Sequence, residues 1–113
     1  MQADIKLRNL ERILRQDPQA LSLSEEMVNR AFLFCSKLES FCNKRSVEEP
    51  ELLIDADNSG GLLLQWWGKK NKKLSLFLTN SESEFIRIQN SVLSRGILVN
   101  TESVLFQFKW LID

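Results

Sequence analysis

Four short segments in which apolar residues alternate with other residues constrain the fold of this chain most. They cover residues 52–57, 62–67, 74–79 and 84–89. Alternation with a period of two is typical of strands, because successive side chains point to opposite faces of a sheet. The connections between the segments are short and rich in Gly, Asn and Ser, which favours antiparallel neighbours. The sequence therefore predicts a four-stranded antiparallel meander.

Two segments before the predicted sheet have the spacing of amphipathic helices. Apolar residues recur every three to four positions in residues 5–16 and again in residues 25–44. Ser22 or Ser24 is in position to cap the second helix. We expect this long second helix to pack on one face of the sheet.

The C-terminal residues 101–112 fit two structures. Their apolar residues alternate as in a strand, but a subset also recurs at helical spacing. Thr101 and Glu102 make a good helix start, so we favour a helix. The predicted fold class is α+β, with N-terminal helices on one face of the meander and a helix at the C-terminus. We expect a single domain over residues 1–113, consisting of a helical extension (1–20) and a helix-plus-sheet core (21–113).

The charge balance and the cysteines limit the classes of function. The chain has 15 Lys and Arg residues and 15 Asp and Glu residues, so its formal net charge is zero. A neutral chain is not typical of dedicated nucleic-acid binders or membrane-surface proteins. Its N-terminus does not have the pattern of a secretory signal, and no apolar run is long enough for a membrane span. Cys35 and Cys42 would lie about 10 Å apart on one helix, too far for a disulfide. Reduced, buried thiols predict a cytoplasmic protein.

Strand alternation divides the predicted sheet into an inner and an outer face. The inner face is expected to pack on the long helix and to hold Leu52, Ile54, Ala56, Leu62, Leu64, Trp66, Leu74, Leu76, Leu78, Ile86 and Ile88. The outer face mixes polar residues with a strip of apolar ones: Leu53, Leu63, Trp67, Phe77 and Phe85. Two interpretations remain open for this strip. A terminal helix covers it, or it is exposed and binds a partner, as contiguous apolar patches often do.

The interaction hypothesis names specific residues. Leu63, Trp67 and Phe77 are the expected apolar contacts of a partner-binding surface. The expected charged rim consists of Lys69, Lys70, Lys72 and Lys73. The same lysine-rich hairpin, residues 68–73, suggests an alternative function in nucleic-acid binding, because lysines beside an aromatic ring can hold phosphates and stack a base. A solvated turn is the simpler interpretation of these lysines.

Enzymatic chemistry has little support in the sequence. The chain has no histidine, which removes the commonest general base and metal ligand. Asp55, Asp57, Ser59 and Gly60 match the opening of a calcium loop, but Trp66 stands where the bidentate carboxylate belongs. We therefore expect no catalytic residues, no cofactor and no metal. A carboxylate-dependent enzyme remains the less favoured alternative.

One family resemblance rests on the segment from residue 50 to residue 66. A proline, an alternating strand, a Gly-Gly turn and a second strand ending in Trp occur here as Pro50, Gly60, Gly61, Leu62, Leu64 and Trp66. This pattern resembles small, mostly uncharacterised bacterial α+β proteins, and residues 108–111 resemble their terminal helix. The resemblance implies an antitoxin-like, immunity or accessory subunit, which binds another protein or itself as a homodimer.

Overall fold

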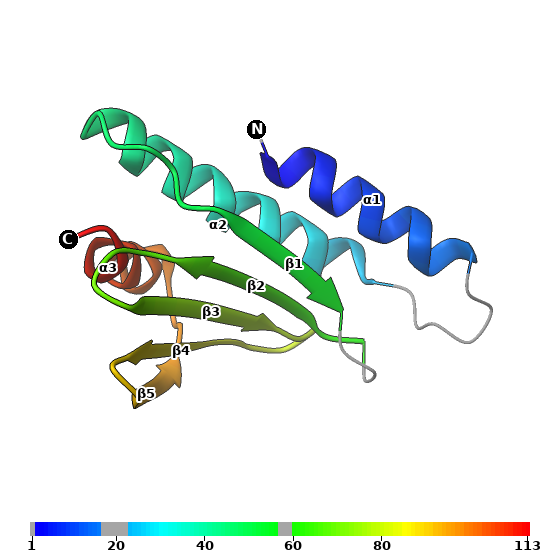
Figure 1. The fold of residues 1–113 in the computed structure, drawn as a ribbon. Helices are drawn as coiled ribbons and strands as arrows, with labels where there is room; N and C mark the ends of the chain where they lie inside the picture. Colours follow the sequence, from blue (N-terminus) through cyan, green and yellow to red (C-terminus); the bar gives the residue numbers. More distant parts are fainter. Residues whose placement is uncertain (1, 17–22, 57–59) are drawn as a thin grey trace.

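The structure is a computed structural model that describes residues 2–16, 23–56 and 60–113. The described helices are α1 (Gln2–Gln16), α2 (Glu25–Lys44) and α3 (Thr101–Ile112). The described strands are β1 (Leu52–Ala56), β2 (Leu62–Trp67), β3 (Lys72–Leu78), β4 (Ser83–Gln89) and β5 (Val92–Ile97). Figure 1 shows their arrangement.

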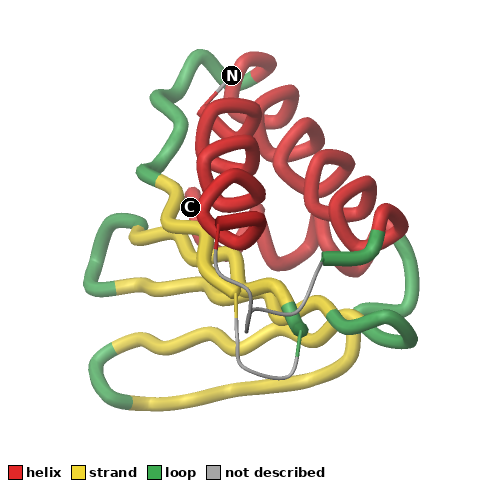
Figure 2. The backbone as a smooth tube through the Cα atoms, turned by 90° about the vertical axis from the view of Figure 1, so that its right-hand side faces the viewer, coloured by secondary structure: helices red, strands yellow, loops and turns green. Residues whose placement is uncertain are grey.

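The described strands form one antiparallel meander in the order β1-β2-β3-β4-β5. The described helices lie together on one side of this sheet, as Figure 2 shows. The α+β prediction, with helices on one face of an antiparallel sheet, is confirmed. The predicted number of strands is wrong: the sheet has five strands, because β5 extends it beyond the predicted fourth.

Local side-chain chemistry fixes the starts of two helices. The Ser24 side chain accepts a hydrogen bond from the Met27 backbone N–H at 3.1 Å and caps α2. The alternative cap, Ser22, lies outside the described residues. Asn100 caps α3 by accepting from the Ser103 N–H at 2.9 Å, while the Ser103 hydroxyl accepts from the Asn100 N–H. Residues 101–112 therefore form the helix that we favoured over a strand.

The hydrophobic core lies between the inner face and the helices. Trp66 is completely buried, and its ring meets that of Phe108 on α3 edge to face, with the centroids 5.4 Å apart. Other fully or almost fully buried side chains of this core come from α2 and from β1, β2 and β3: Met27, Ala31, Cys35, Leu38, Leu52, Leu62, Leu64, Leu74, Leu76 and Leu78. No described helix is long and apolar enough to cross a membrane.

Helix α1 is attached to the edge of the sheet formed by β1. Leu7 is completely buried and belongs to the hydrophobic core. The Lys6 ammonium donates to the backbone carbonyl of Leu52, at the start of β1. The side of α1 that carries Leu7 therefore packs against the core of the same chain.

The turn between β3 and β4 gives β4 a different parity from the predicted one. Leu78 pairs with Ser83, so Phe85 and Arg87 lie on the inner face, and the Arg87 guanidinium stacks over the Trp110 ring of α3 at 5.1 Å. Ile86 and Ile88, which we predicted on the inner face, lie on the outer face instead. The predicted outer position of Phe85 is wrong for the same reason. A turn one residue longer or shorter would exchange the two faces of the strand.

Strand β5 begins directly after a tight two-residue turn. Asn90 and Ser91 both have positive φ angles, of 50° and 67°, which suits a hairpin turn between twisted strands. Gly96 lies within β5. A Cβ atom at this position would lie 2.8 Å from the Phe85 ring, so the glycine makes room for that side chain.

Arg30 of α2 holds the β3–β4 turn against the helix layer. Its guanidinium donates to the carbonyls of Thr79 and Glu82 and, at 2.8 Å, to the hydroxyl of the buried Ser83. We expect Arg30→Ala to lower the free energy of unfolding by about 1.5–3 kcal/mol, because it removes charged hydrogen bonds to partly buried acceptors. Urea denaturation measures this. Arg12→Ala, at an exposed α1 position, is the control and should change it by less than about 0.5 kcal/mol. Equal losses would contradict the role of Arg30.

Candidate protein interface

The candidate site is the outer face of the sheet, on which no described helix lies. Directly paired residues of antiparallel strands point to the same face, so the register defines three rows of side chains. The Trp67 row consists of Trp67, Lys73, Ile88 and Leu93. The central row consists of Leu53, Gln65, Ser75, Ile86 and Arg95. The Asp55 row consists of Asp55, Leu63, Phe77, Glu84 and Ile97.

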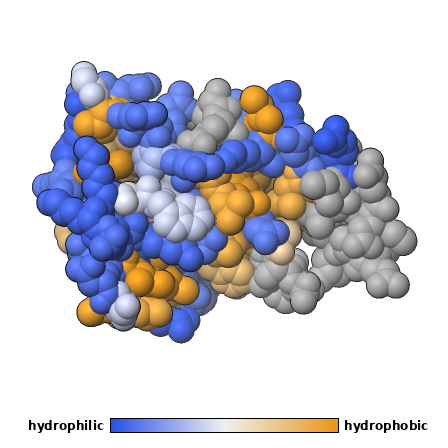
Figure 3. All heavy atoms as spheres, in the orientation of Figure 1, coloured by the Kyte–Doolittle hydropathy of each residue, from blue (hydrophilic) through white to orange (hydrophobic). Residues whose placement is uncertain are grey.

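More than half of the side chains in these rows are apolar, and several are well exposed. Leu53 is 48% exposed, Leu93 57% and Ile97 55%. Figure 3 shows apolar atoms over β1 and β2 and again over the β4–β5 hairpin, with hydrophilic atoms between them. The solvent-facing side of an antiparallel sheet normally carries mostly polar side chains. Its apolar character therefore makes this face a candidate interface.

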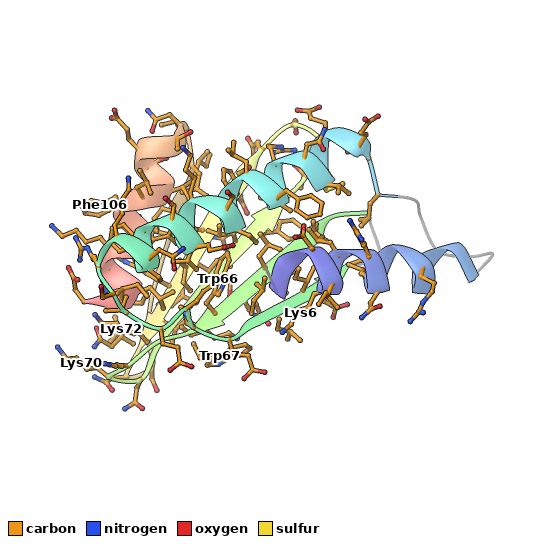
Figure 4. All side chains as sticks on the ribbon, turned by 90° about the horizontal axis from the view of Figure 1, so that it is seen from above. Lys6, Trp66, Trp67, Lys70, Lys72 and Phe106 are labelled. Carbon is orange, nitrogen blue, oxygen red and sulfur yellow. The ribbon has the colours of Figure 1, made fainter. Side chains whose placement is uncertain are left out.

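Trp66 and Trp67 are adjacent in sequence but point to opposite sides of β2. Trp66 is completely buried, whereas Trp67 is 47% exposed. Figure 4 shows Trp66 between the sheet and the helices, and Trp67 on the other side of the sheet. The Lys73 ammonium lies 5.4 Å from the centroid of the Trp67 ring, in cation–π geometry. Trp67 therefore presents a broad apolar surface that Lys73 holds in place.

Leu63 and Phe77 form a second apolar contact on this face. They are directly paired across β2 and β3. Both side chains are partly buried by their neighbours. The structure thus brings Leu63, Trp67 and Phe77 to the same face of the sheet. Their role in binding a partner remains a prediction.

The four lysines of the 68–73 hairpin do not form one rim. Only Lys73 belongs to the outer-face rows, while Lys69 is exposed in the turn. Lys70 donates to the C-terminal Asp113 backbone oxygen at 3.3 Å. Lys72 is only 9% exposed, donates to the Trp110 carbonyl at 2.7 Å and lies over the Trp110 ring on the inner side. The predicted rim therefore lacks Lys72, and a single basic cluster for nucleic acid has less support.

Sequence reasoning missed four apolar members of the outer face: Ile86, Ile88, Leu93 and Ile97. Ile86 and Ile88 were placed on the wrong face, and β5 was not predicted at all. The signal that was available is the Asn90-Ser91 pair between two apolar segments, since Asn at this position is typical of hairpin turns.

Four of the other polar residues of this face form two pairs. The Gln65 amide donates to the Ser75 hydroxyl at 3.2 Å, and Arg95 lies 3.8 Å from the Glu84 carboxylate. Asp55, the first residue of the calcium-loop match, accepts a hydrogen bond from the Ala56 N–H through its side chain. Asp57 and Ser59 lie outside the described residues. Among the residues described, no group of three or more Cys, Asp and Glu side chains is placed to hold a metal ion.

A hollow of about 420 Å³ opens beside Trp67, at the end of the sheet where the α2–β1 connection and the C-terminus of α3 meet. Its walls include Glu48, Glu49 and Glu51 from that connection, and Lys69 from the hairpin. Trp67 is one of the residues that line this hollow, so the surface around Trp67 is concave on that side.

The cysteines are buried on the helix side of the molecule, away from this face. Burial raises the pKa of the Cys35 thiol from about 9 to about 12, and nearby carboxylates, Glu49 first, add to the effect. Burial and Glu49 also raise the pKa of Cys42. A raised thiol pKa disfavours the reactive thiolate, so these cysteines do not have the environment of a nucleophile.

Comparison of the chain with protein-family models, with curated proteins and with solved structures gives no match. The resemblance to small bacterial α+β proteins therefore stays a prediction.

Proposed function

We propose that this protein is a non-enzymatic binding module whose outer sheet face docks another protein chain. The observation that supports this most is that about half-exposed apolar side chains occur in all three rows of a sheet face that no described helix covers. Trp67, Leu63 and Phe77 are the proposed apolar contacts, and Lys73 and Lys69 contribute charge beside them. A large aromatic ring at such a position is the usual energetic centre of an interface.

The proposal includes a cytoplasmic location and a role such as antitoxin, immunity protein or accessory subunit. The buried cysteines support the location, since thiols persist in reducing compartments. Binding through the lysine hairpin to nucleic acid is the less favoured alternative, because Lys72 and Lys73 point to opposite sides of the sheet.

Site-specific photo-crosslinking in living cells tests the proposed surface. We expect a benzoylphenylalanine in place of Leu53, on the outer face, to form a covalent adduct with a bound chain. The matched control is the same residue in place of Leu33, which is 44% exposed on α2, where we expect no adduct. Mass spectrometry of the adduct identifies what is bound. Equal yields at the two positions, or no adduct at Leu53, would contradict the proposal.

A further inference from the structure

A second hollow, of about 350 Å³, lies on the inner side of the sheet, between the β4–β5 hairpin and α3. Arg87 of β4, Ser94 of β5 and Trp110 of α3 are among the residues that line it. Figure 1 shows this hairpin at the edge of the sheet away from α1 and α2. The volume reaches the lower end of the range of small-molecule sites, about 300–1,000 Å³.

Arg87 gives this hollow a positive charge in a fixed orientation. The Arg87 guanidinium lies over the Trp110 ring, 5.1 Å from its centroid. Stacking uses the flat face of the guanidinium and leaves the N–H groups at its edge available to an acceptor. No residue that the structure describes accepts a hydrogen bond from this guanidinium or forms an ion pair with it. Arg87 therefore keeps its whole capacity to bind an anion by paired hydrogen bonds.

Two further donors line the same hollow. Ser94 is directly paired with Arg87 across β4 and β5, so its hydroxyl lies on the same face as the guanidinium. The Asn90 side-chain oxygen accepts a hydrogen bond from the Asn71 amide at 3.3 Å, which leaves the Asn90 NH₂ group as a donor. Within the described part of the chain, neither this NH₂ group nor the Ser94 hydroxyl has an acceptor.

The charge around the hollow is positive. No Asp or Glu occurs among its described lining residues. Glu84, the only carboxylate of β4 and β5, lies on the outer face and pairs with Arg95 there. Lys72 does not line the hollow, but its ammonium lies 5.3 Å from the centroid of the Trp110 ring and adds a second positive charge close to Arg87. Two cations with no carboxylate facing them favour an anion with two negative charges.

We propose that this hollow binds a phosphate group, with Arg87 as the principal contact and Ser94 and Asn90 as additional donors. A phosphate group carries almost two negative charges at neutral pH and presents three strong acceptor oxygens, so it matches both the charge and the separate donors. A carboxylate has one charge and two oxygens, which the guanidinium alone would satisfy. The ligand is either free phosphate or a phosphate monoester. The site lies on the opposite side of the sheet from the proposed docking face and does not depend on that proposal.

A nuclear magnetic resonance titration of the full chain tests this site. The probes are inorganic phosphate and phenyl phosphate. Acetate and dimethyl phosphate, which each carry one negative charge, are the comparison anions. The signals to follow are the indole N–H of Trp110 and the backbone N–H of Ser94. The variants are Arg87→Gln, Arg87→Lys and Ser94→Ala. Arg95→Gln is the matched control, because it removes the same charge from the neighbouring strand but on the outer face.

We expect inorganic phosphate to shift both signals to saturation with a Kd of about 1–5 mM. Arg87→Gln should raise this Kd at least about tenfold, because it removes charged hydrogen bonds. Arg87→Lys keeps the charge but loses the forked geometry, and Ser94→Ala removes one neutral donor, so each should raise the Kd about threefold. The Arg95→Gln control should change it by less than about twofold, and the comparison anions should bind at least about fivefold more weakly than phosphate.

Three results would each overturn the phosphate site: no saturation up to about 20 mM phosphate, equal effects of Arg87→Gln and Arg95→Gln, or a comparison anion that binds as tightly as phosphate. Dispersed amide signals verify that each variant is folded. If Arg87→Gln does not fold, Arg87→Lys and Ser94→Ala decide the result against the same control. Phenyl phosphate that binds more tightly than inorganic phosphate supports a monoester as the ligand, and binding that is no tighter supports free phosphate.

Discussion

Trp66→Ala is expected to lower the free energy of unfolding by about 3–5 kcal/mol, while Trp67→Ala lowers it by less than about 1 kcal/mol. The two residues have the same chemistry and adjacent positions, so the difference comes from their environment. Trp66 is completely buried against Phe108, and its removal leaves a cavity in the core. Trp67 is 47% exposed, and its nearest described ring contact is the Lys73 ammonium, a cation–π contact worth about 0.5–1 kcal/mol.

Chemical denaturation of both variants in parallel measures this difference. If Trp66→Ala does not fold, Trp66→Phe provides a smaller truncation that keeps a ring against Phe108. The Trp66 indole N–H has no hydrogen-bond partner among the described residues, so a phenyl ring loses no hydrogen bond there. Losses of equal size for Trp66→Ala and Trp67→Ala would contradict the assignment of the two faces. In the crosslinking assay the order reverses, since Trp67→Ala should weaken binding while the fold stays intact.

The Cys35 thiol is expected to react with a disulfide reagent at pH 8 more than about tenfold more slowly in the folded than in the unfolded protein. The reason is that its pKa of about 12, compared with about 9 for an ordinary thiol, lowers the thiolate fraction, and the higher nucleophilicity of a more basic thiolate offsets only part of this loss. The Cys42→Ser variant isolates Cys35, and the same protein in guanidinium is the control. A folded-state rate within tenfold of the unfolded rate would contradict the buried environment.

The same raised pKa predicts a dependence of stability on pH. Below about pH 9 the Cys35 thiol is protonated in both states, so its contribution to stability is fully present. Above that pH the unfolded thiol ionises while the folded one does not, so the free energy of unfolding falls. Between pH 8 and pH 10 wild type should lose about 1 kcal/mol more than Cys35→Ala, which lacks the titrating group.

Local patterns predicted the elements that depend on local physics. Alternation placed β1, β2 and β3, and the apolar spacing of residues 25–44 placed α2, because these segments bury one regular face. Alternation along β2 also predicted the opposite directions of Trp66 and Trp67, and with them the candidate surface.

The errors arose where a contact distant in sequence decides the structure. Ile86 and Ile88 are apolar and were assigned to the core, but the β3–β4 turn, which Arg30 of α2 contacts, orients them outward. The whole of β5 was missed because Gly96 interrupts its pattern, and the reason for that glycine is the Phe85 ring across the ladder. Lys72 was expected on the same rim as the other lysines of the hairpin. Its contacts with the carbonyl and ring of Trp110 on α3 hold it on the inner side of the sheet instead. Arg30 and Trp110 are far in sequence from the residues that they contact, 53 positions from Ser83 and 38 positions from Lys72.

The two borders of the sheet differ in how they can accept a further strand. Helix α1 packs along β1 and donates to its backbone through Lys6. Among the described strands β5 pairs only with β4, and it carries the exposed Val92, Leu93 and Ile97. An extended segment from another molecule would therefore find a free ladder beside β5 and an obstructed one beside β1. Strand addition is therefore possible at one edge of the sheet only. If two chains join through their β5 strands, the two outer edges of the joined sheet are both β1 edges, which α1 obstructs. Such an assembly stops at two chains and does not continue into a fibre.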